Sequence, residues 1–240
     1  MVAAFKWEVG PLLRSRSAKG NPSRIKGPHP KIYSLDLDSQ PVVLAIAGAG
    51  AENSFRAAQF LCRNFDLRGL ATMGFAGGLV PELRLGDVIL ADRVIDEVTG
   101  QRFECQTDLL PIRFARQGGL LSASAVVSSS AQKIRLGNES GTIAVDMESA
   151  GVARAAILAG LPFCAIKSIT DAAEQSLSID FNACLREDKT MSAWAVARQG
   201  LTNSDAARDL WKLAWGARQA AGSLAAAMVG VNRLAIPATK

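Results

Sequence analysis

Four acidic residues follow predicted strands, where their carboxylates could exchange protons with a bound ligand. Asp146 and Glu148 come at the end of one strand, Asp171 directly follows another, and Glu8 follows a short apolar start at residues 2–5. Alternation along an extended strand places Asp146 and Glu148 on the same side. Ligands of parallel α/β sheets bind beyond the carboxyl ends of strands, so we expect these acids to converge there as proton carriers. The alternative for Glu148 is a cap on the helix that begins there.

Other common site chemistries find little material in this chain. A single histidine, His29, leaves nothing for a Ser-His-Asp triad or a histidine metal site. The cysteines at 62, 105, 164 and 184 form no C-x-x-C pair, so we expect neither a zinc site nor a disulfide framework. Gly48 and Gly50 begin a dinucleotide-type pattern, but Asn53 stands where its third glycine belongs. A tight strand-to-helix turn is the favoured interpretation of these glycines, and a Walker-type loop is absent from the sequence.

Apolar runs and helical spacing indicate the elements that must position the acids. Strands alternate with helices, which predicts an α/β fold: one three-layer α/β/α domain over residues 1–240, with a central mixed, mostly parallel sheet. A helical extension begins at about residue 204. The predicted strands are 2–5, 41–47, 70–75, 87–95, 125–128, 142–147 and 163–170, the helices are 53–65, 148–159 and 205–228, and the loops are 15–31 and 99–119. Gly160 is expected to stop the second helix, and Ser204 to cap the third.

Composition narrows the class of protein. Hydrophobic residues make up 49% of the 240 positions and charged residues 20%, which excludes a disordered chain. The net charge is +5, and its basic clusters near residues 14–26 lack interleaved aromatics, so we expect no nucleic-acid partner. Lys6 and Glu8 interrupt any secretory apolar run, and no run reaches the length of a membrane span. We expect a cytoplasmic protein.

At this point the motifs resemble a known family. AVDMESAGVARAA followed by PFCAIKSITDAA is similar to the nucleoside phosphorylase superfamily, and in particular to its 5′-methylthioadenosine/S-adenosylhomocysteine nucleosidases. MGFAGGL…LRLGDVILAD and FKWEV match further elements of that pattern, in order, over about residues 1–185. FAGGL, GDVILADRV, AVDMES and the helix ARDLWKLAWGARQAA resemble most closely the hopanoid-associated subgroup, which is held to release adenine from adenosylhopane.

The resemblance implies a role for each matching residue. Asp171 would protonate N7 of the purine, Glu148 would bind the ribose hydroxyls, and Glu8 would orient an attacking water. The other implied substrate-binding residues are Met147 against the sugar, Asp146 beside the site, Val126 and Val127 along the base, and Ala47 and Gly48 near the ribose or the nucleophile. The implied ligand is a small nucleoside, and no metal or redox cofactor is required.

Departures from the family pattern bear on the nucleophile. Thr170 replaces the serine that usually precedes the acid, and the segment 122–127 lacks an aromatic that stacks on the base. Phe75 and Thr72 stand where related enzymes carry phosphate ligands, although Lys167 or the basic residues near the start could supply positive charge. Hydrolysis is therefore favoured over phosphorolysis, which would use phosphate as a co-substrate.

The C-terminal helix leaves several interpretations open. It carries an apolar stripe of Leu210, Leu213, Ala214, Ala217, Ala221 and Leu224, widened by Trp211 and Trp215. Packing against the domain or a twin subunit, as in a homodimer, is favoured, and the alternative is a surface for an apolar substrate tail or a peripheral membrane contact. We therefore expect a nucleosidase that releases adenine from a nucleoside with an apolar 5′ substituent. The alternatives are a phosphate-dependent phosphorylase, an ordinary methylthioadenosine/S-adenosylhomocysteine nucleosidase, and a non-catalytic nucleoside-binding protein, which the three retained acids disfavour.

Overall fold

A computed structural model describes residues 1–15, 18–25, 31–37, 40–110, 112, 114–177, 181–184 and 204–230. The chain forms an α/β domain with a mixed sheet, as predicted. The strands are β1 (Val2–Ala3), β2 (Ala18–Ile25), β3 (Lys31–Leu37), β4 (Gln40–Ile46), β5 (Leu70–Gly78), β6 (Val88–Asp96), β7 (Arg102–Glu104), β8 (Arg116–Ser122), β9 (Ala144–Asp146) and β10 (Phe163–Asp171). The helices are α1 (Lys6–Leu13), α2 (Ala51–Asn64), α3 (Ser130–Ser140), α4 (Ser149–Leu158), α5 (Phe181–Cys184) and α7 (Ser204–Gly230), with a 3-10 turn η1 (Thr107–Leu109).

Five strands close into a ring at the centre of the sheet. β5 pairs with β10, β10 with β6, β6 with β8, β8 with β9, and β9 returns to β5. The sheet continues from β5 through β1, β4 and β3 to β2 at its edge. The β5–β10, β6–β8 and β8–β9 pairs are parallel, whereas β3 joins β4 and β2 in antiparallel hairpins. Within the ring, β10–β6 and β5–β9 are antiparallel. The mixed character of the sheet therefore comes both from the ring and from the hairpins of β2, β3 and β4.

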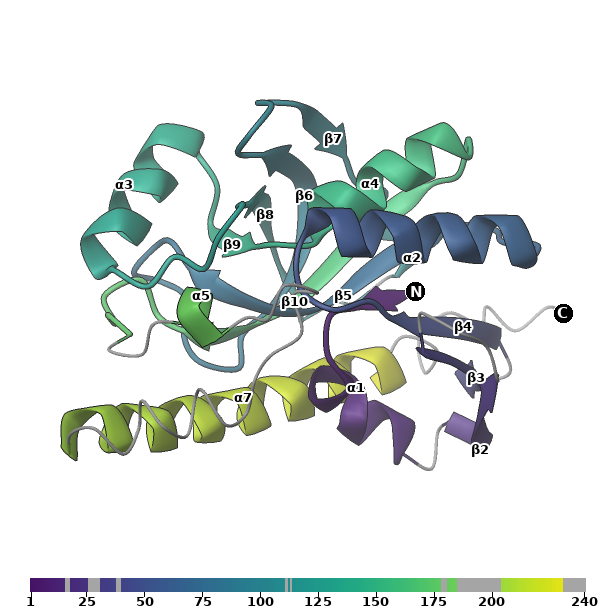
Figure 1. Ribbon diagram of the computed structural model, residues 1–240, viewed down its shortest axis with the longest axis horizontal. Coiled ribbons are helices and arrows are strands. Elements are labelled where there is room, and N and C mark those ends of the chain that lie inside the picture. The colour runs from purple at the N-terminus through teal and green to yellow at the C-terminus, as the bar shows by residue number, and fades with distance from the viewer. Residues whose placement is uncertain are drawn as a thin grey trace, which may run out of the picture.

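Helices cover both faces of the sheet and complete the three layers. α2 and α4 lie together over one face, α1 and α7 lie over the other, and α3 lies beside the β8–β9 end (Figure 1). α2 and α4 approach each other closely because Gly151 has no side chain: a Cβ there would lie 1.9 Å from the Ala51 carbonyl oxygen. No helix in the described part of the chain is long and apolar enough to cross a membrane.

Several predicted boundaries are wrong in the first half of the chain. Residues 15–31 were predicted as a loop, but β2 occupies 18–25 because its backbone pairs with β3 despite Gly20 and Pro22. The ladder between β2 and β3 is irregular between Lys19 and Ser23, around those two residues. The loop predicted over 99–119 contains β7 and the start of β8. β3, α1 and α3 were not predicted at all.

A predicted strand after β8 and two predicted helix ends can be compared with the structure. The short strand predicted at 125–128 is absent, because the β9 partner ends at Asp146, opposite Ser122, and leaves the next residues without a ladder. Gly160 follows the end of α4 with a φ of 65°, as expected of a C-terminal stop. Ser204 is the first residue of α7, but its side chain lies outside the described ones, so the predicted cap stays a prediction. His29 also lies outside the described residues.

Candidate active site

Glu8 lies in the first turn of α1, the unpredicted helix that follows β1. Its side chain is 5% exposed. The Phe5 N–H donates to Oε2 at 2.9 Å and the Phe75 N–H donates to Oε1 at 3.2 Å, so both oxygens are fixed by backbone. Gly74 makes room for this carboxylate, because a Cβ at that position would lie 3.0 Å from Oε1. The β1–α1 junction therefore holds Glu8 against β5.

The junction between β9 and α4 delivers two more acids, and they have different roles in the fold. Asp146 Oδ2 accepts the Ser149 N–H at 3.1 Å and the Ser149 hydroxyl at 2.5 Å, so Asp146 satisfies the start of α4. Glu148 makes no such cap; its Oε1 instead accepts the N–H of Gly50 at 2.9 Å. The interpretation of Glu148 as a helix cap is thus wrong, and its carboxylate faces the turn that precedes α2.

Lys167 joins these acids from β10, which is separated from β9 by β5. Its buried ammonium lies 2.7 Å from Asp146 Oδ2 and 4.0 Å from Glu148 Oε2. Both carboxylates therefore face Lys167. Strand alternation is not the reason, because β9 ends at Asp146 and Glu148 already has helical backbone angles. Lys167 is a buried cation among Asp146, Glu148 and Glu8, and all three carboxylates interact with its single positive charge.

Burial and mutual repulsion shift the ionisation of this cluster. Burial, and then the neighbouring Glu148, raise the pKa of Glu8 to about 7, although Lys167 opposes the shift. Burial also raises the pKa of Glu148, again against the effect of Lys167. Burial lowers the pKa of Lys167, but Asp146, Glu148 and Glu8 more than compensate and raise it above its usual value. Glu8 is therefore a carboxyl that can exchange a proton near neutral pH.

Asp171 ends β10 and is held by a second buried lysine. The β5–β10 ladder shifts register between Ile169 and Asp171, and Asp171 then pairs with Gly77, which also pairs with Val145 of β9. Lys133 of α3, with an exposed fraction of 0%, donates to Asp171 Oδ2, and the Thr170 hydroxyl donates to Oδ1 at 2.7 Å. Asp171 thus lies at the same sheet edge as Asp146 but has its own cation.

The remaining predicted residues border this edge in different ways. Val126 and Val127 lie in the loop after β8, which the Leu177 N–H and the Ser130 N–H tie to the segment that follows Asp171. The Val127 side chain packs into a small core cluster with Leu79 and Val145. Met147, Phe75 and Thr170 are half-buried. Ala47 and Gly48 donate backbone N–H groups to the carbonyls of residues 3 and 4, so they extend the pairing of β4 with β1.

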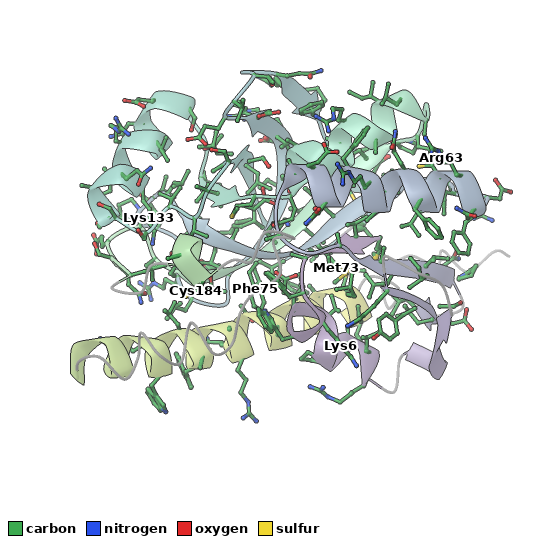
Figure 2. The ribbon with its side chains drawn as sticks, viewed as in Figure 1. Lys6, Arg63, Met73, Phe75, Lys133 and Cys184 are labelled. Atoms are coloured by element: carbon green, nitrogen blue, oxygen red, sulfur yellow. The ribbon has the colours of Figure 1, made fainter. Side chains whose placement is uncertain are left out.

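Two partners were missed by sequence reasoning: the Gly50 N–H and Lys133. Figure 2 places Lys133 at the α3 end of the molecule, away from Phe75, which lies nearer α1. A signal for α3 was present in the sequence, because Gly141 ends that helix in the left-handed region with a φ of 62°. Among the described residues, no group of three or more His, Cys, Asp or Glu is placed to hold a metal ion.

The arrangement suits proton transfer and stabilisation of a cation. Buried carboxylates in a site that excludes water stabilise a positive charge more strongly than they would in bulk water. Glu8 can take up a proton near neutral pH, and Asp171 is oriented at both of its oxygens.

Comparisons with known proteins agree on one family. A family model described as the phosphorylase superfamily matches residues 1–111 and 104–198. The 5′-methylthioadenosine/S-adenosylhomocysteine nucleosidase of Mycobacterium bovis is 28% identical over 211 residues, 69% of this chain and 83% of that one. The same-named enzyme of Geobacillus thermodenitrificans is 24% identical over 222 residues, 82% and 93% of the two chains.

Solved structures share the fold. The nucleosidase of Neisseria meningitidis in complex with methylthio-immucillin-A superposes with a TM-score of 0.71 at 21% identity, covering 95% of this chain and 96% of that one. The futalosine hydrolase of Helicobacter pylori gives a TM-score of 0.69 at 18% identity, covering 95% of each chain.

Proposed function

Because the chain belongs to the phosphorylase superfamily, we propose that it releases adenine by hydrolysis from a nucleoside with an apolar 5′ substituent. Membership of this superfamily and its nucleosidase relatives make the chain an enzyme that cleaves N-glycosyl bonds. The observation that supports the proposal is that the three acids lie around β5. Glu8 accepts the Phe75 N–H, Asp171 pairs with Gly77, and Lys167, which pairs with Gly74, lies 4.0 Å from Glu148.

The three acids divide the chemistry between them. In its protonated form, Asp171 gives a proton to N7 of the purine while the C1′–N9 bond breaks and its electron pair passes to the base. Asp171 is then left as the carboxylate that pairs with Lys133. Glu148 binds the ribose hydroxyls and stabilises the positive charge that develops at C1′. Water then adds to C1′, and Glu8 takes the proton that this water loses. General acid help of this kind is typically worth about 10²–10⁴-fold in rate.

Charge favours water over phosphate as the nucleophile. Three carboxylates surround one ammonium, that of Lys167, so a phosphate anion entering beside them would meet net negative charge. Thr72, which stands where related phosphorylases carry a phosphate ligand, is fully buried in β5. The basic side chains between residues 16 and 30 lie outside the described ones.

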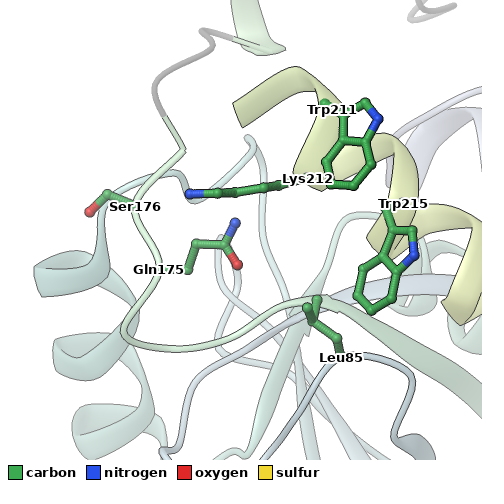
Figure 3. Close-up of a pocket in the computed structure, with 6 residues that line it drawn as sticks. All are labelled: Leu85, Gln175, Ser176, Trp211, Lys212 and Trp215. Atoms are coloured by element: carbon green, nitrogen blue, oxygen red, sulfur yellow. The ribbon is translucent and has the colours of Figure 1, made fainter. Parts of the chain in front are cut away.

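A cavity beside α7 supports an apolar 5′ group, of which adenosylhopane is the example that the sequence suggests. It has a volume of about 630 Å³ and is lined by Leu85, Gln175, Ser176, Trp211, Lys212 and Trp215. Figure 3 shows both tryptophans projecting from α7 on one side of the cavity, with Gln175 facing them. Gln175 lies four residues after Asp171 along the chain, and Gly216, next to Trp215, lies against the Thr170 carbonyl oxygen. Each buried CH₂ of a tail would add about 0.8 kcal/mol to binding.

An ordinary methylthioadenosine/S-adenosylhomocysteine nucleosidase is the second candidate, because the relatives above carry that name. Its 5′ groups are small or polar and would leave the cavity beside α7 largely empty. The two candidates share the acids and differ only in the 5′ group.

A nucleoside panel tests the proposal. Adenosine, methylthioadenosine, S-adenosylhomocysteine and an adenosyl-lipid in detergent are each incubated with and without phosphate, and adenine and the sugar product are quantified. We expect phosphate-independent release and the highest kcat/KM for the adenosyl-lipid. Strict phosphate dependence with a sugar 1-phosphate product would overturn hydrolysis. A tenfold advantage for methylthioadenosine, about 1.4 kcal/mol, would reject the apolar-tail specificity.

A further inference from the structure

We infer that Lys133 is a positioning residue of the reaction, which holds Asp171 and the segment after it in the geometry for proton transfer; this rests on the proposed function. The inference starts from the burial of Lys133, whose exposed fraction is 0%. A buried ammonium is costly unless each of its donors is satisfied. An unpartnered lysine at this place would be expelled or would destabilise the fold.

The three donors of Lys133 are satisfied by one short segment. The ammonium donates to Asp171 Oδ2, to the Ala172 carbonyl at 3.1 Å and to the Gln175 carbonyl at 2.8 Å. All three acceptors lie within residues 171–175, which begin at the last residue of β10. Lys133 therefore fixes both the candidate acid and the backbone that leads from it to the cavity beside α7.

Helix α3 is built so that this lysine faces inward. Only Lys133 and Gly137 are buried among its residues. Gly137 lets the helix approach the end of β5, because a Cβ there would lie 2.8 Å from the Leu79 carbonyl oxygen. A helix usually docks through several buried apolar side chains, whereas α3 adds to its half-buried Leu136 a glycine contact and a fully buried cation.

The charge of Lys133 also suits the chemistry of Asp171. When Asp171 gives a proton to the leaving base it becomes a carboxylate, and the adjacent ammonium stabilises that anion in a low-dielectric site. The Thr170 hydroxyl donates to Oδ1, and each carboxylate oxygen keeps a further lone pair, so a proton can still be carried towards the substrate. Loss of Lys133 should therefore lower kcat more than it raises KM.

A double-mutant cycle separates this role from a merely structural one. Lys133→Met, Asp171→Asn and the combined variant are assayed on the panel nucleoside that the wild type cleaves fastest, with Arg135→Met on the exposed side of α3 as the control. We expect Lys133→Met to lower kcat at least about tenfold with less than threefold change in KM. In the Asp171→Asn background the same substitution should change kcat less than threefold, and Arg135→Met should be neutral.

Other outcomes overturn the inference. Normal kcat in folded Lys133→Met, or an equal loss in both backgrounds, would show that Lys133 does not act through Asp171. If Lys133→Met does not fold, Lys133→Arg replaces it in the cycle, and we expect it to retain more activity than any variant without the charge. Absence of adenine release by the wild type would overturn both the proposed function and this inference, whereas a normal Lys133 variant overturns only the latter.

Discussion

Two buried lysines pair with three of the four carboxylates of the candidate site. Lys167 serves Asp146 and Glu148, and Lys133 serves Asp171, while Glu8 is held by backbone N–H groups. Removing one member of a buried ion pair typically costs about 3–5 kcal/mol, because the other charge remains buried. Substitutions at these residues therefore change stability as well as chemistry, and both must be measured.

At Asp171, we expect substitution by asparagine to remove most turnover while the fold is retained. Asp171→Asn cannot donate the proton and should lower kcat by at least about 10²-fold. Its Tm should also fall, since Lys133 loses its carboxylate. Adenine release and thermal unfolding are measured beside Asp108→Asn, an exposed acid near the opposite end of β10. More than about a tenth of the wild-type kcat would contradict the general-acid role.

The raised pKa of Glu8 predicts an acid limb in the pH profile. With a pKa of about 7, Glu8 is protonated below pH 7, and a neutral carboxyl cannot take the proton of the attacking water. The kcat/KM should therefore decrease about tenfold per pH unit below pH 7 and level off above it. The profile of Glu8→Gln should be low throughout and lack this limb. A flat wild-type profile down to pH 5.5, with the protein still folded by circular dichroism, would argue against Glu8 as the base.

At the scale of elements, α7 consists of two parts with different surroundings. Its C-terminal part buries Leu224, Ala225 and Met228 in a core with residues of α1, β5 and β10. Its earlier part crosses the end of β10 at Gly216, and carries Trp211 and Trp215 with exposed fractions of 70% and 52%. Of the predicted apolar stripe, Ala221 and Leu224 are buried against the domain, Leu213 and Ala217 are half-buried, and Ala214 is exposed. The side chain of Leu210 lies outside the described ones, and packing of the rest against a twin subunit stays a prediction.

Two glycines of α7 test the contact with β10. A Cβ at Gly216 would lie 2.8 Å from the Thr170 carbonyl oxygen, whereas nothing lies within 4 Å of one at Gly222. Alanine favours a helix over glycine by about 0.8–1.0 kcal/mol at either position. Gly222→Ala should thus raise the free energy of unfolding, while Gly216→Ala should lower it by about 1–3 kcal/mol and reduce kcat by moving Thr170 and Asp171. The free energy of unfolding is measured by denaturant titration and kcat by adenine release. An equal rise in the free energy of unfolding in both variants would show that the contact between Gly216 and β10 is unimportant.

At the scale of the molecule, the exposed Trp211 and Trp215 give α7 an apolar surface that is open to contact with a group outside this chain. The chain carries a net charge of +5, yet its candidate site gathers four acids. We predict a homodimer, to be measured by sedimentation, and keep a peripheral membrane contact as the alternative partner of the tryptophans. Neither a homodimer nor a membrane contact replaces the hypothesis that the cavity binds an apolar 5′ group. That hypothesis is tested separately, by substrate selectivity.

Substitution of Trp211 and Trp215 by alanine should change specificity without changing the chemistry. The double variant should lose at least about tenfold in kcat/KM for an adenosyl-lipid and less than threefold for adenosine, because only the lipid tail reaches the cavity. Ile157→Ala and Leu158→Ala, exposed apolar residues at the end of α4, provide a matched control. Equal losses for both substrates, or none, would contradict tail binding; loss of vesicle co-sedimentation instead would assign the tryptophans to a membrane.

Most of the central strands could be predicted from the sequence by itself. Buried strands are apolar runs of limited length, so β4, β5, β6, β9 and β10 were predicted in order, and the acids at their ends followed. β2 was missed because its composition is that of a loop, and only pairing with β3 makes it a strand. Local composition thus predicts the continuously apolar strands. It missed β3, whose buried residues Ile32, Tyr33, Leu35 and Leu37 are interrupted by polar ones.

The acids have local partners as well, but their distant partners were decided by tertiary structure alone. Lys133 is 38 residues from Asp171, the Phe75 N–H is 67 residues from Glu8, and the Gly50 N–H is 98 residues from Glu148. No periodicity or local motif joins residues so far apart, because their meeting depends on strand order, register and the approach of helices through glycine. The four acids could be picked out from the sequence. Their ionisation and orientation were determined by the closed ring of strands, because it brings distant backbone and lysine donors to them.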